Sequence, residues 1–218
     1  MPESYSLDEV TSRLYTAVLS DVLDSVGCTG QVAEPGLRPL SPDMRLAGYA
    51  RTARAVSVSS TPQAPYAKLL EAIDGMSGDD VLVLALQPSS QSAIFGGLLA
   101  TAVNVAGARG VVVDGYARDA SEIQHIGLPT FAKGLMPLDS AGRDEVVEVE
   151  EAVALGGVLV HPGDLIVADL DGVVVVPSAL EQTVLRLAFE KVAGEGEVRH
   201  ALRGGMPTAE AFAKYGIL

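Results

Sequence analysis

A cluster of charged side chains stands directly after one of the most apolar stretches of the chain. Arg118 and Asp119 follow residues 110–115, which read Gly-Val-Val-Val-Asp-Gly, and Glu122 lies three residues beyond Asp119. A short β-branched apolar run that ends in a turn signal is typical of a strand buried in a sheet. In α/β folds, ligands bind beyond the carboxyl ends of such strands. The cluster is therefore the first candidate for a binding or catalytic site.

The same residues also admit a purely local explanation. Asp119 and Glu122 have the spacing of a capping box, in which two side chains satisfy free N–H groups at the start of a helix. Arg118 would then be a solvated surface charge. Residue chemistry alone leaves both explanations open.

Several frequent kinds of site are excluded by missing motifs. The three histidines have no HxH or HExxH spacing for zinc and stand alone in the sequence, as His125, His161 and His200. The sequence has no GxGxxG after its first strand, so no dinucleotide-binding site is expected. It also has no GxSxG, the motif of the nucleophile elbow in α/β-hydrolases. Cys28 has no base near it in the sequence and is expected to be inert. Asp169 and Asp171 flank a turn and are expected only to shape that hairpin.

Composition limits the partners. The formal net charge is -13, whereas phosphate contacts need clustered Lys and Arg, so no nucleic-acid partner is expected. No apolar run reaches the roughly 18 residues of a membrane span, and residues 1–8 lack the features of a signal peptide. One cysteine, Cys28, allows no internal disulfide and suits a reducing cytosol. We therefore expect a cytoplasmic protein without a membrane segment.

Periodicity and turn signals predict the elements that position the charged cluster. Ser6 and Glu9 form a capping box for a helix over residues 7–26, which Gly27 ends, and Ser178 with Glu181 repeats the pattern near the C-terminus. Further helices are expected over residues 65–76, 96–108, 121–126 and 208–215. Strands are expected over residues 45–59, 80–85, 110–115, 130–133, 145–149, 157–160, 165–169 and 173–176. No repeat, linker or charge block divides the chain, so we predict one α/β domain over residues 1–218.

The charged cluster is also part of a longer pattern. Gly97 is followed, after twenty residues, by Arg118-Asp119-x-x-Glu122. Matching stretches occur in order, with fitting spacing, over residues 96–100, 110–115, 161–177 and 211–218. The pattern resembles the signature of the family that holds the 4-hydroxy-4-methyl-2-oxoglutarate aldolases and the ribonuclease E regulators, the RraA-like proteins. The resemblance covers nearly the whole chain.

The resemblance implies a role for each residue of the pattern. Asp119 would anchor a divalent metal, Mg²⁺ or Mn²⁺, and Arg118 would bind the carboxylate and oxo oxygens of a 2-oxo acid. At a helix N-terminus, backbone N–H groups would donate hydrogen bonds to an anion from four residues, Gly96, Gly97, Leu98 and Leu99. These roles are physically sound, because one carboxylate can hold a hydrated Mg²⁺, an Arg fork matches a carboxylate, and a helix N-terminus favours negative charge.

The resemblance also implies the reaction, the fold and the assembly. Cleavage between C3 and C4 of a 2-oxo acid leaves a pyruvate enolate, whose charge the metal and Arg118 would stabilise. The expected function is a metal-dependent carbon–carbon lyase that acts as an oxaloacetate decarboxylase, a 4-hydroxy-4-methyl-2-oxoglutarate aldolase, or both. The expected fold is an α/β domain with a layered or barrel-like central sheet, of the swivelling phosphohistidine-domain type. The expected assembly is a homotrimer or a hexamer.

One position departs from the aldolase pattern. The aldolases carry an acidic residue at the position of Gly97, where it helps a water molecule to act as base. Aldol cleavage needs a base and decarboxylation does not, so Gly97 weakens the case for the aldolase reaction and leaves decarboxylation chemically intact. Asp114 and Glu122 are the nearby acids that could replace the missing one. Glu195, in the C-terminal segment, either supports the site of a neighbouring subunit or belongs to a solvated helix face.

A second class of function is a non-enzymatic regulator that binds and inhibits a ribonuclease, as one branch of this family does. Such a protein needs no carboxylate that anchors a metal. The presence of both Arg118 and Asp119 therefore favours the enzyme.

Overall fold

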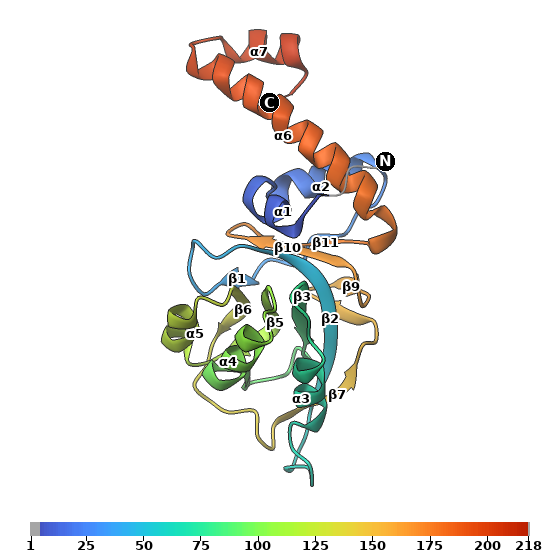
Figure 1. Cartoon of the computed structure of the whole chain (residues 1–218), viewed down its shortest axis with the longest axis vertical. Helices are drawn as coiled ribbons and strands as arrows, with labels where there is room; N and C mark the ends of the chain where they lie inside the picture. Colours follow the sequence, from blue (N-terminus) through green and yellow to red (C-terminus); the bar gives the residue numbers. More distant parts are fainter. Residues whose placement is uncertain (1–4, 218) are drawn as a thin grey trace.

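Four parallel strands form the centre of the computed structural model, which describes residues 5–217 (Figure 1). In spatial order they are β6 (Thr130–Leu135), β5 (Gly110–Ala117), β3 (Asp80–Ala85) and β2 (Leu46–Ser57). Antiparallel strands extend this centre, with β1 (Arg38–Pro39) beside β6, and β10 (Leu165–Asp169) and β11 (Gly172–Val176) beyond β2. β4 (Ala93–Phe95) pairs with β5 and β7 (Asp144–Val149) pairs with β2, which completes a nine-stranded sheet. Of the expected domain, residues 1–4 and 218 lie outside the described residues.

The long strand β2 gives the sheet its curvature. Its first residues pair with β10 and its last with β7, while β3 lies along its other edge. The register with β7 shifts between Arg54 and Ala55, and such a bulge bends the strand that carries it. The sheet consequently curls into a nearly closed, barrel-like form. The expected fold class, α/β with a barrel-like central sheet, is confirmed.

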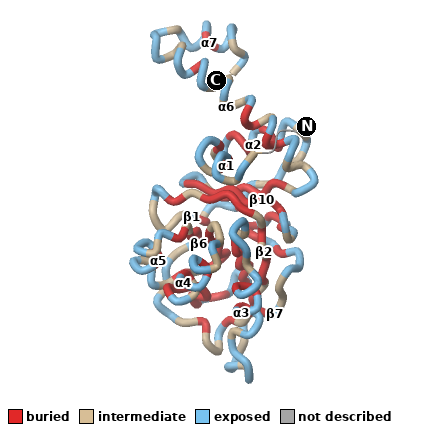
Figure 2. Tube along the Cα trace, in the orientation of Figure 1, coloured by how far each residue is buried: buried red, intermediate tan, exposed pale blue. Residues whose placement is uncertain are grey.

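The sheet is covered differently on its two faces. On one face, Val111 and Val113 of β5 pack in a core shared with α3 (Ala67–Asp74), α4 (Gly97–Val105) and α5 (Ala120–Ile126). On the other face, Val112 packs with the hairpin of β8 (Val153–Leu155) and β9 (Val158–Val160). β5 is apolar on both sides because both of its faces are covered. Figure 2 shows the resulting buried sheet strands, with exposed stretches on the surrounding helices.

The prediction of one helix over residues 7–26 is wrong in one respect. The structure has two helices there, α1 (Leu7–Arg13) and α2 (Thr16–Ser25). The capping box of Ser6 and Glu9 is present at the start of α1. Between the helices, Leu14 adopts an extended conformation and stays fully buried. The carboxylate of Asp169 accepts hydrogen bonds from the backbone N–H (2.8 Å) and the hydroxyl (2.7 Å) of Thr16. These bonds start a second helix, while the apolar spacing runs through the break.

The C-terminal helices form an arm. α6 (Glu181–Arg203) begins on the sheet and extends away from it, and α7 (Thr208–Tyr215) folds back beside its outer half (Figure 1). The capping box expected at Ser178 and Glu181 is wrong, because a 3-10 turn, η1 (Ser178–Leu180), precedes α6 and no side chain caps either element. The backbone N–H of Ser178 donates instead to Asp164 (2.9 Å). Within residues 5–217, no helix is long and apolar enough to cross a membrane.

The other expected helices and the eight expected strands are present, with ends that match or differ by at most three residues. Three short strands were not expected, namely β1, β4 and β8. Of these, β4 matters most for function, because the chain passes from it directly into Gly96 and α4.

Asp169 has a larger structural role than the hairpin role expected from sequence. Besides its two bonds to Thr16 it accepts from the backbone N–H of Asp171 (3.0 Å). We expect Asp169→Ala to lower the free energy of unfolding by about 2 kcal/mol, because it removes a helix cap and leaves buried donors unpaired. Urea unfolding followed by circular dichroism measures this. Asp171→Ala, which changes an exposed side chain of the same turn, should stay within about 0.5 kcal/mol of the native protein, and equal losses in both variants would contradict the assignment.

Candidate active site

Parallel pairing of β4 with β5 brings two strand-to-helix connections together. Phe95 is the register partner of Ala117, and the backbone N–H of Arg118 donates to the carbonyl of Phe95 (2.9 Å). Gly96, the first residue after β4, therefore lies beside Arg118 and Asp119, the first two residues after β5, at the start of α4 and α5. Sequence analysis placed its candidates at this edge of the sheet, and the structure brings them into contact.

The connection after β4 comes closest to the connection after β5 at Gly96. A Cβ atom at this position would lie 2.8 Å from Oδ2 of Asp119 and 3.0 Å from Cγ of Arg118. Its backbone is extended, with φ of -154°, a conformation open to any residue. Glycine is therefore required here because a side chain has no room, and not because of the backbone conformation.

Asp119 does not behave as a helix cap. It occupies the N-cap position of α5, but its backbone is left-handed (φ 57°, ψ 37°) and its side chain makes no capping bond. Its Oδ2 accepts a hydrogen bond from the backbone N–H of Gly97 (3.1 Å), at the start of the neighbouring helix. The local explanation, a capping box with Glu122, is therefore wrong. Left-handed backbone at a non-glycine residue is strained, and such strain is concentrated at functional sites.

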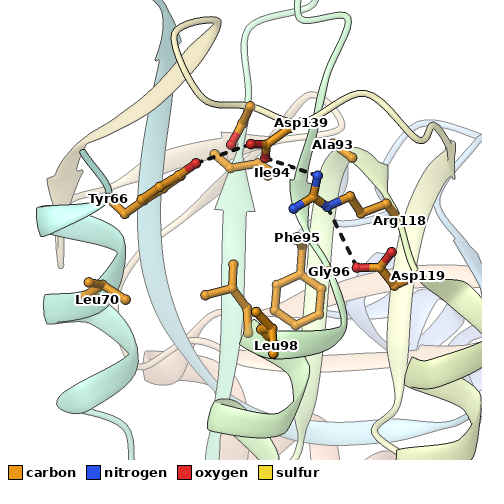
Figure 3. A pocket seen from close by; sticks show the side chains of 12 residues that line it. Tyr66, Leu70, Ala93, Ile94, Phe95, Gly96, Leu98, Arg118, Asp119 and Asp139 are labelled. Atoms are coloured by element: carbon orange, nitrogen blue, oxygen red, sulfur yellow. Dashed lines mark hydrogen bonds and ion pairs between the residues drawn. The ribbon is translucent and has the colours of Figure 1, made fainter. Parts of the chain in front are cut away.

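Two carboxylates flank the guanidinium of Arg118 (Figure 3). Its Nη1 lies 3.3 Å from Oδ1 of Asp139, and its Nε lies 3.7 Å from Oδ2 of Asp119. The hydroxyl of Tyr66 donates to the other oxygen of Asp139 (3.4 Å). Burial, and next the negative charge of Asp139, raise the pKa of the Tyr66 hydroxyl above its usual value, which keeps this hydroxyl protonated and able to donate. The pair of carboxylates holds the guanidinium in one place.

Asp139 and Tyr66 were not found from the sequence. Asp139 lies in the loop after β6, tied to β4 by a hydrogen bond from the N–H of Ala93 to the carbonyl of Leu138 (2.8 Å). The rule that led to Arg118, a polar residue after a parallel strand, applies equally to Asp139. Tyr66 precedes α3 with a left-handed backbone, and no sequence signal marked it.

Arg118 and Asp119 stand between two hollows. The first has a volume of about 280 Å³ and is otherwise lined by Tyr66, Leu70, Ala93, Ile94, Phe95, Gly96, Leu98, Leu99, Asp139 and Ser140. The second has a volume of about 300 Å³ and is otherwise lined by Ala120, Leu135, Met136 and Pro137. These volumes are at the lower end of ligand cavities, roughly 300–1,000 Å³. The site suits a small metabolite better than a nucleotide.

The remaining candidates lie in three different surroundings. Glu122 packs beside Gly97, with its Cγ 3.1 Å from where a Cβ on Gly97 would stand. Asp114 is buried toward the β8–β9 hairpin, where it accepts from the N–H of Gly156 (3.0 Å) and pairs with Lys133 (2.5 Å). It does not line either hollow.

Glu195 lies on α6, where it bonds the hydroxyl of Tyr15 and approaches Arg199 (3.9 Å). The helix α6 extends from the sheet on the side away from α4 and α5 (Figure 1). Gly96, Leu98 and Leu99 thus share a cavity with Arg118 and Asp119, whereas Gly97, Glu122 and Glu195 line neither hollow.

The donor set suits a hydrated divalent cation. Asp119 has a side chain that is 52% exposed, and only its Oδ2 is engaged by hydrogen bonding among the described residues. No group of three or more His, Cys, Asp or Glu side chains within residues 5–217 could enclose a metal. Mg²⁺ keeps several waters and is commonly bound through one or two carboxylates together with its substrate. Asp119 therefore fits the single protein ligand of such an ion.

Comparison with known sequences places this geometry in a family. The RraA-like model, described as Aldolase/RraA, matches residues 16–175. A protein of Halalkalibacterium halodurans, named provisionally as a 4-hydroxy-4-methyl-2-oxoglutarate aldolase, is 29% identical over 197 residues, which cover 90% of this chain and 89% of that protein.

Similar solved structures support the same family. Streptomyces coelicolor RraAS2, described as an unusual member of the RNase ES inhibitor RraA protein family, has a TM-score of 0.78 and 30% identity, with 91% of this chain and 98% of that one covered. An uncharacterized protein from Pseudomonas syringae has a TM-score of 0.81 and 29% identity, with 94% and 95% covered. The chain belongs to the Aldolase/RraA family, as the resemblance in sequence implied. Among its relatives are proteins named as aldolases and proteins described as ribonuclease inhibitors.

Gly96→Ala tests the close approach that builds the site. The added methyl group cannot stand 2.8 Å from Oδ2 of Asp119, so we expect the side chains of Arg118 and Asp119 to move by about 0.5 Å or more. A crystal structure of the variant measures the displacement, and its melting temperature should stay unchanged because the backbone is unstrained. Gly78→Ala is the control, since a Cβ there meets nothing closer than 3.8 Å. Unmoved side chains in Gly96→Ala would refute the steric account.

Proposed function

We propose that this chain is a divalent-metal-dependent carbon–carbon lyase that cleaves a small 2-oxo acid and releases pyruvate. The observation that carries the proposal is the arrangement of Arg118 and Asp119 at the mouth of a small cavity. Arg118 is held there by two carboxylates, and Asp119 is turned away from its own helix with one oxygen free of hydrogen bonds within residues 5–217. Relatives named as aldolases support the same class of reaction.

Each residue of the site has one task in this proposal. Asp119 would hold Mg²⁺ or Mn²⁺, which supplies a Lewis acid for the oxo group of the substrate. Arg118 binds the carboxylate of the 2-oxo acid through its N–H groups and keeps the C3–C4 bond in a fixed orientation. The apolar side chains around the cavity exclude water from the reacting carbon atoms. The electrons of the C3–C4 bond pass to C3 and the oxo oxygen as an enolate, whose charge Arg118 stabilises.

The two reactions considered differ in their need for a base. In decarboxylation the leaving group is carbon dioxide, and the enolate then takes a proton from water to give pyruvate. In aldol cleavage the hydroxyl on C4 must lose its proton as the bond breaks. Gly97 has no side chain for this, and Glu122 lies against it from α5. Glu122 lines neither hollow, so the site supports decarboxylation better than aldol cleavage.

The alternative function is a regulator that binds and inhibits a ribonuclease. The description of the Streptomyces coelicolor structure supports it. An inhibitor acts through its outer surface, however, and has no use for a cavity with a guanidinium fixed between carboxylates. A protein that releases no pyruvate under any metal, but inhibits a ribonuclease, would establish the alternative.

The proposed assembly and location are those expected from the sequence. The chain is proposed to form a cytoplasmic homotrimer or hexamer. Leu98, which lines the first hollow, is 89% exposed, and Val105 at the other end of α4 is 81% exposed. Apolar side chains exposed in this way are typical of a surface that another subunit covers.

Removal of the metal ligand gives the sharpest test. Asp119→Asn keeps the shape of the side chain and removes its charge, so pyruvate release should fall to background. Mn²⁺ binding, measured by calorimetry, should weaken by at least the roughly 10- to 100-fold that loss of an outer-shell partner costs. Glu122→Gln is the control, which should bind Mn²⁺ normally. Full activity of Asp119→Asn, or of the native protein in excess EDTA, would end the metal-dependent proposal.

Arg118→Lys keeps a positive charge but removes the planar fork. We expect kcat/KM for pyruvate release to fall by about 100-fold or more, because about 3 kcal/mol of charge-assisted hydrogen bonding is lost. Steady-state kinetics over a panel of 2-oxo acids measures this. Arg186→Lys, at an exposed ion pair on α6, serves as the control. Kinetics of Arg118→Lys within twofold of the native protein would show that Arg118 does not hold the substrate.

A further inference from the structure

The start of β7 carries a buried carboxylate that the proposed chemistry does not use. Asp144 is 3% exposed, and its side chain accepts hydrogen bonds from the hydroxyls of Ser57 (3.0 Å), Ser90 (2.7 Å) and Ser92. Burial of a carboxylate is costly unless hydrogen bonds replace its hydration. Bonds from hydroxyls to a carboxylate are among the stronger ones in proteins. Asp144 is therefore a firm attachment point for the segments that carry these serines.

Two of the three serines lie in the segment that leads into the site. Ser90 and Ser92 come just before β4, and Ser92 directly precedes its first residue. Both hydroxyls donate to the same carboxylate oxygen of Asp144, Oδ2. Because β4 has only two register pairs with β5, contacts outside the sheet must contribute to holding it. The bonds to Asp144 thus help to fix the strand that delivers Gly96.

The backbone of Asp144 fixes a second segment of the site. Its N–H donates to the carbonyl of Ser140 (2.9 Å), in the loop that carries Asp139. The next residue, Glu145, accepts from the backbone N–H of Tyr66 (2.8 Å), whose hydroxyl donates to Asp139. The first two residues of β7 therefore hold both Asp139 and its hydroxyl partner.

We propose that Asp144 is a positioning residue for the cleavage reaction. Its side chain fixes β4, and its backbone fixes the loop of Asp139. The two segments that flank the guanidinium of Arg118 thus share one attachment point. Asp144 lines neither hollow, so it acts through Arg118 and not on the substrate. Misplacement of a binding group by about 1 Å can cost about 100-fold in rate, so the effect of such an attachment is measurable.

The inference rests on the proposed function, because it takes Arg118 to bind the substrate. It goes beyond that function by giving a role in catalysis to a residue of β7 that no sequence motif marks. The contacts that carry it all lie within one chain. They therefore do not depend on what covers the cavity.

Matched serine variants test the proposal on the full-length protein with Mn²⁺ and oxaloacetate. Ser92→Ala removes a hydroxyl beside β4, whereas Ser57→Ala removes the same group from the end of β2. We expect kcat/KM for pyruvate release, above the background of Mn²⁺ alone, to fall about tenfold or more in Ser92→Ala and in Asp144→Ala. Ser57→Ala, which changes an exposed residue, should stay within about twofold of the native protein.

Asp144→Asn separates hydrogen bonding from charge. The amide oxygen can accept from Ser90 and Ser92, and the amide N–H₂ can donate to Ser57, whose hydroxyl also accepts. We expect kcat/KM of Asp144→Asn to exceed that of Asp144→Ala by about fivefold or more, because most of the bonds are restored. Equal kcat/KM values in the two variants would overturn the account by hydrogen bonding.

Hydrogen exchange, measured by mass spectrometry, gives a readout that needs no turnover. Peptides over residues 90–97 should exchange about tenfold faster in Ser92→Ala than in the native protein, while those over β3 stay unchanged, because only the β4 segment opens more often. Asp169→Ala is the control for a general loss of stability. It also removes a buried carboxylate, but one that holds Thr16 at the start of α2, and it should leave kcat/KM at the native value.

The outcomes separate this inference from the proposed function. Native exchange over residues 90–97 in both Ser92→Ala and Asp144→Ala overturns the inference, whether or not the protein is a lyase. Native kcat/KM in these variants of an active lyase also overturns it, as do equal losses in Ser57→Ala or Asp169→Ala. A native protein that releases no pyruvate from any 2-oxo acid overturns the proposed function and the catalytic role of Asp144 together, and exchange then still decides whether Asp144 fixes β4.

Discussion

The pairing of β4 with the end of β5 is the contact on which the site depends. β5 is longer than its neighbour β3, and β4 pairs with its final residues, Tyr116 and Ala117, beyond the point where β3 ends. Since the pairing is parallel, both strands deliver their next residues to the same place. Gly96 thereby touches Arg118 and Asp119 across a gap that has no room for a Cβ atom. A change that loosened β4 would separate the groups that must act together.

The charges of the site are arranged to hold Arg118 still. Asp119 adopts a left-handed backbone, at a cost on the order of 1 kcal/mol. The hydrogen bond from the N–H of Gly97 offsets a cost of that size, because hydrogen bonds to charged groups contribute about 1.5–3 kcal/mol. Asp139 restrains the guanidinium on its other side. A guanidinium fixed before the ligand arrives needs no reorganisation during reaction, which is the condition for effective electrostatic catalysis.

The sequence predicted the parts of this protein that depend on neighbouring residues. The apolar run of residues 110–115 and the charged residues after it correctly located β5 and the edge that carries Arg118 and Asp119. β4 was missed because a strand of three residues has too few positions to show a pattern, and it exists only through its partner. The break between α1 and α2 was missed because the apolar spacing continues through Leu14, while the cap that restarts the helix comes from Asp169. Asp139 follows β6 as Arg118 follows β5, but its contact with β4, like the contact of Tyr66 with β7, depends on tertiary pairing that no local pattern encodes.

The net charge of -13 bears on which anions reach such a site. At physiological salt, charges more than about 8 Å apart are largely screened, so the acidic surface weakly opposes an approaching anion and the groups within contact distance decide its binding. The opposition grows with the charge of the ligand, whereas the attraction at the centre is limited to what Arg118 and one cation on Asp119 can supply. The net charge of the chain therefore weakly slows the approach of every anion, and Arg118 with the groups in contact with it determines which anions bind.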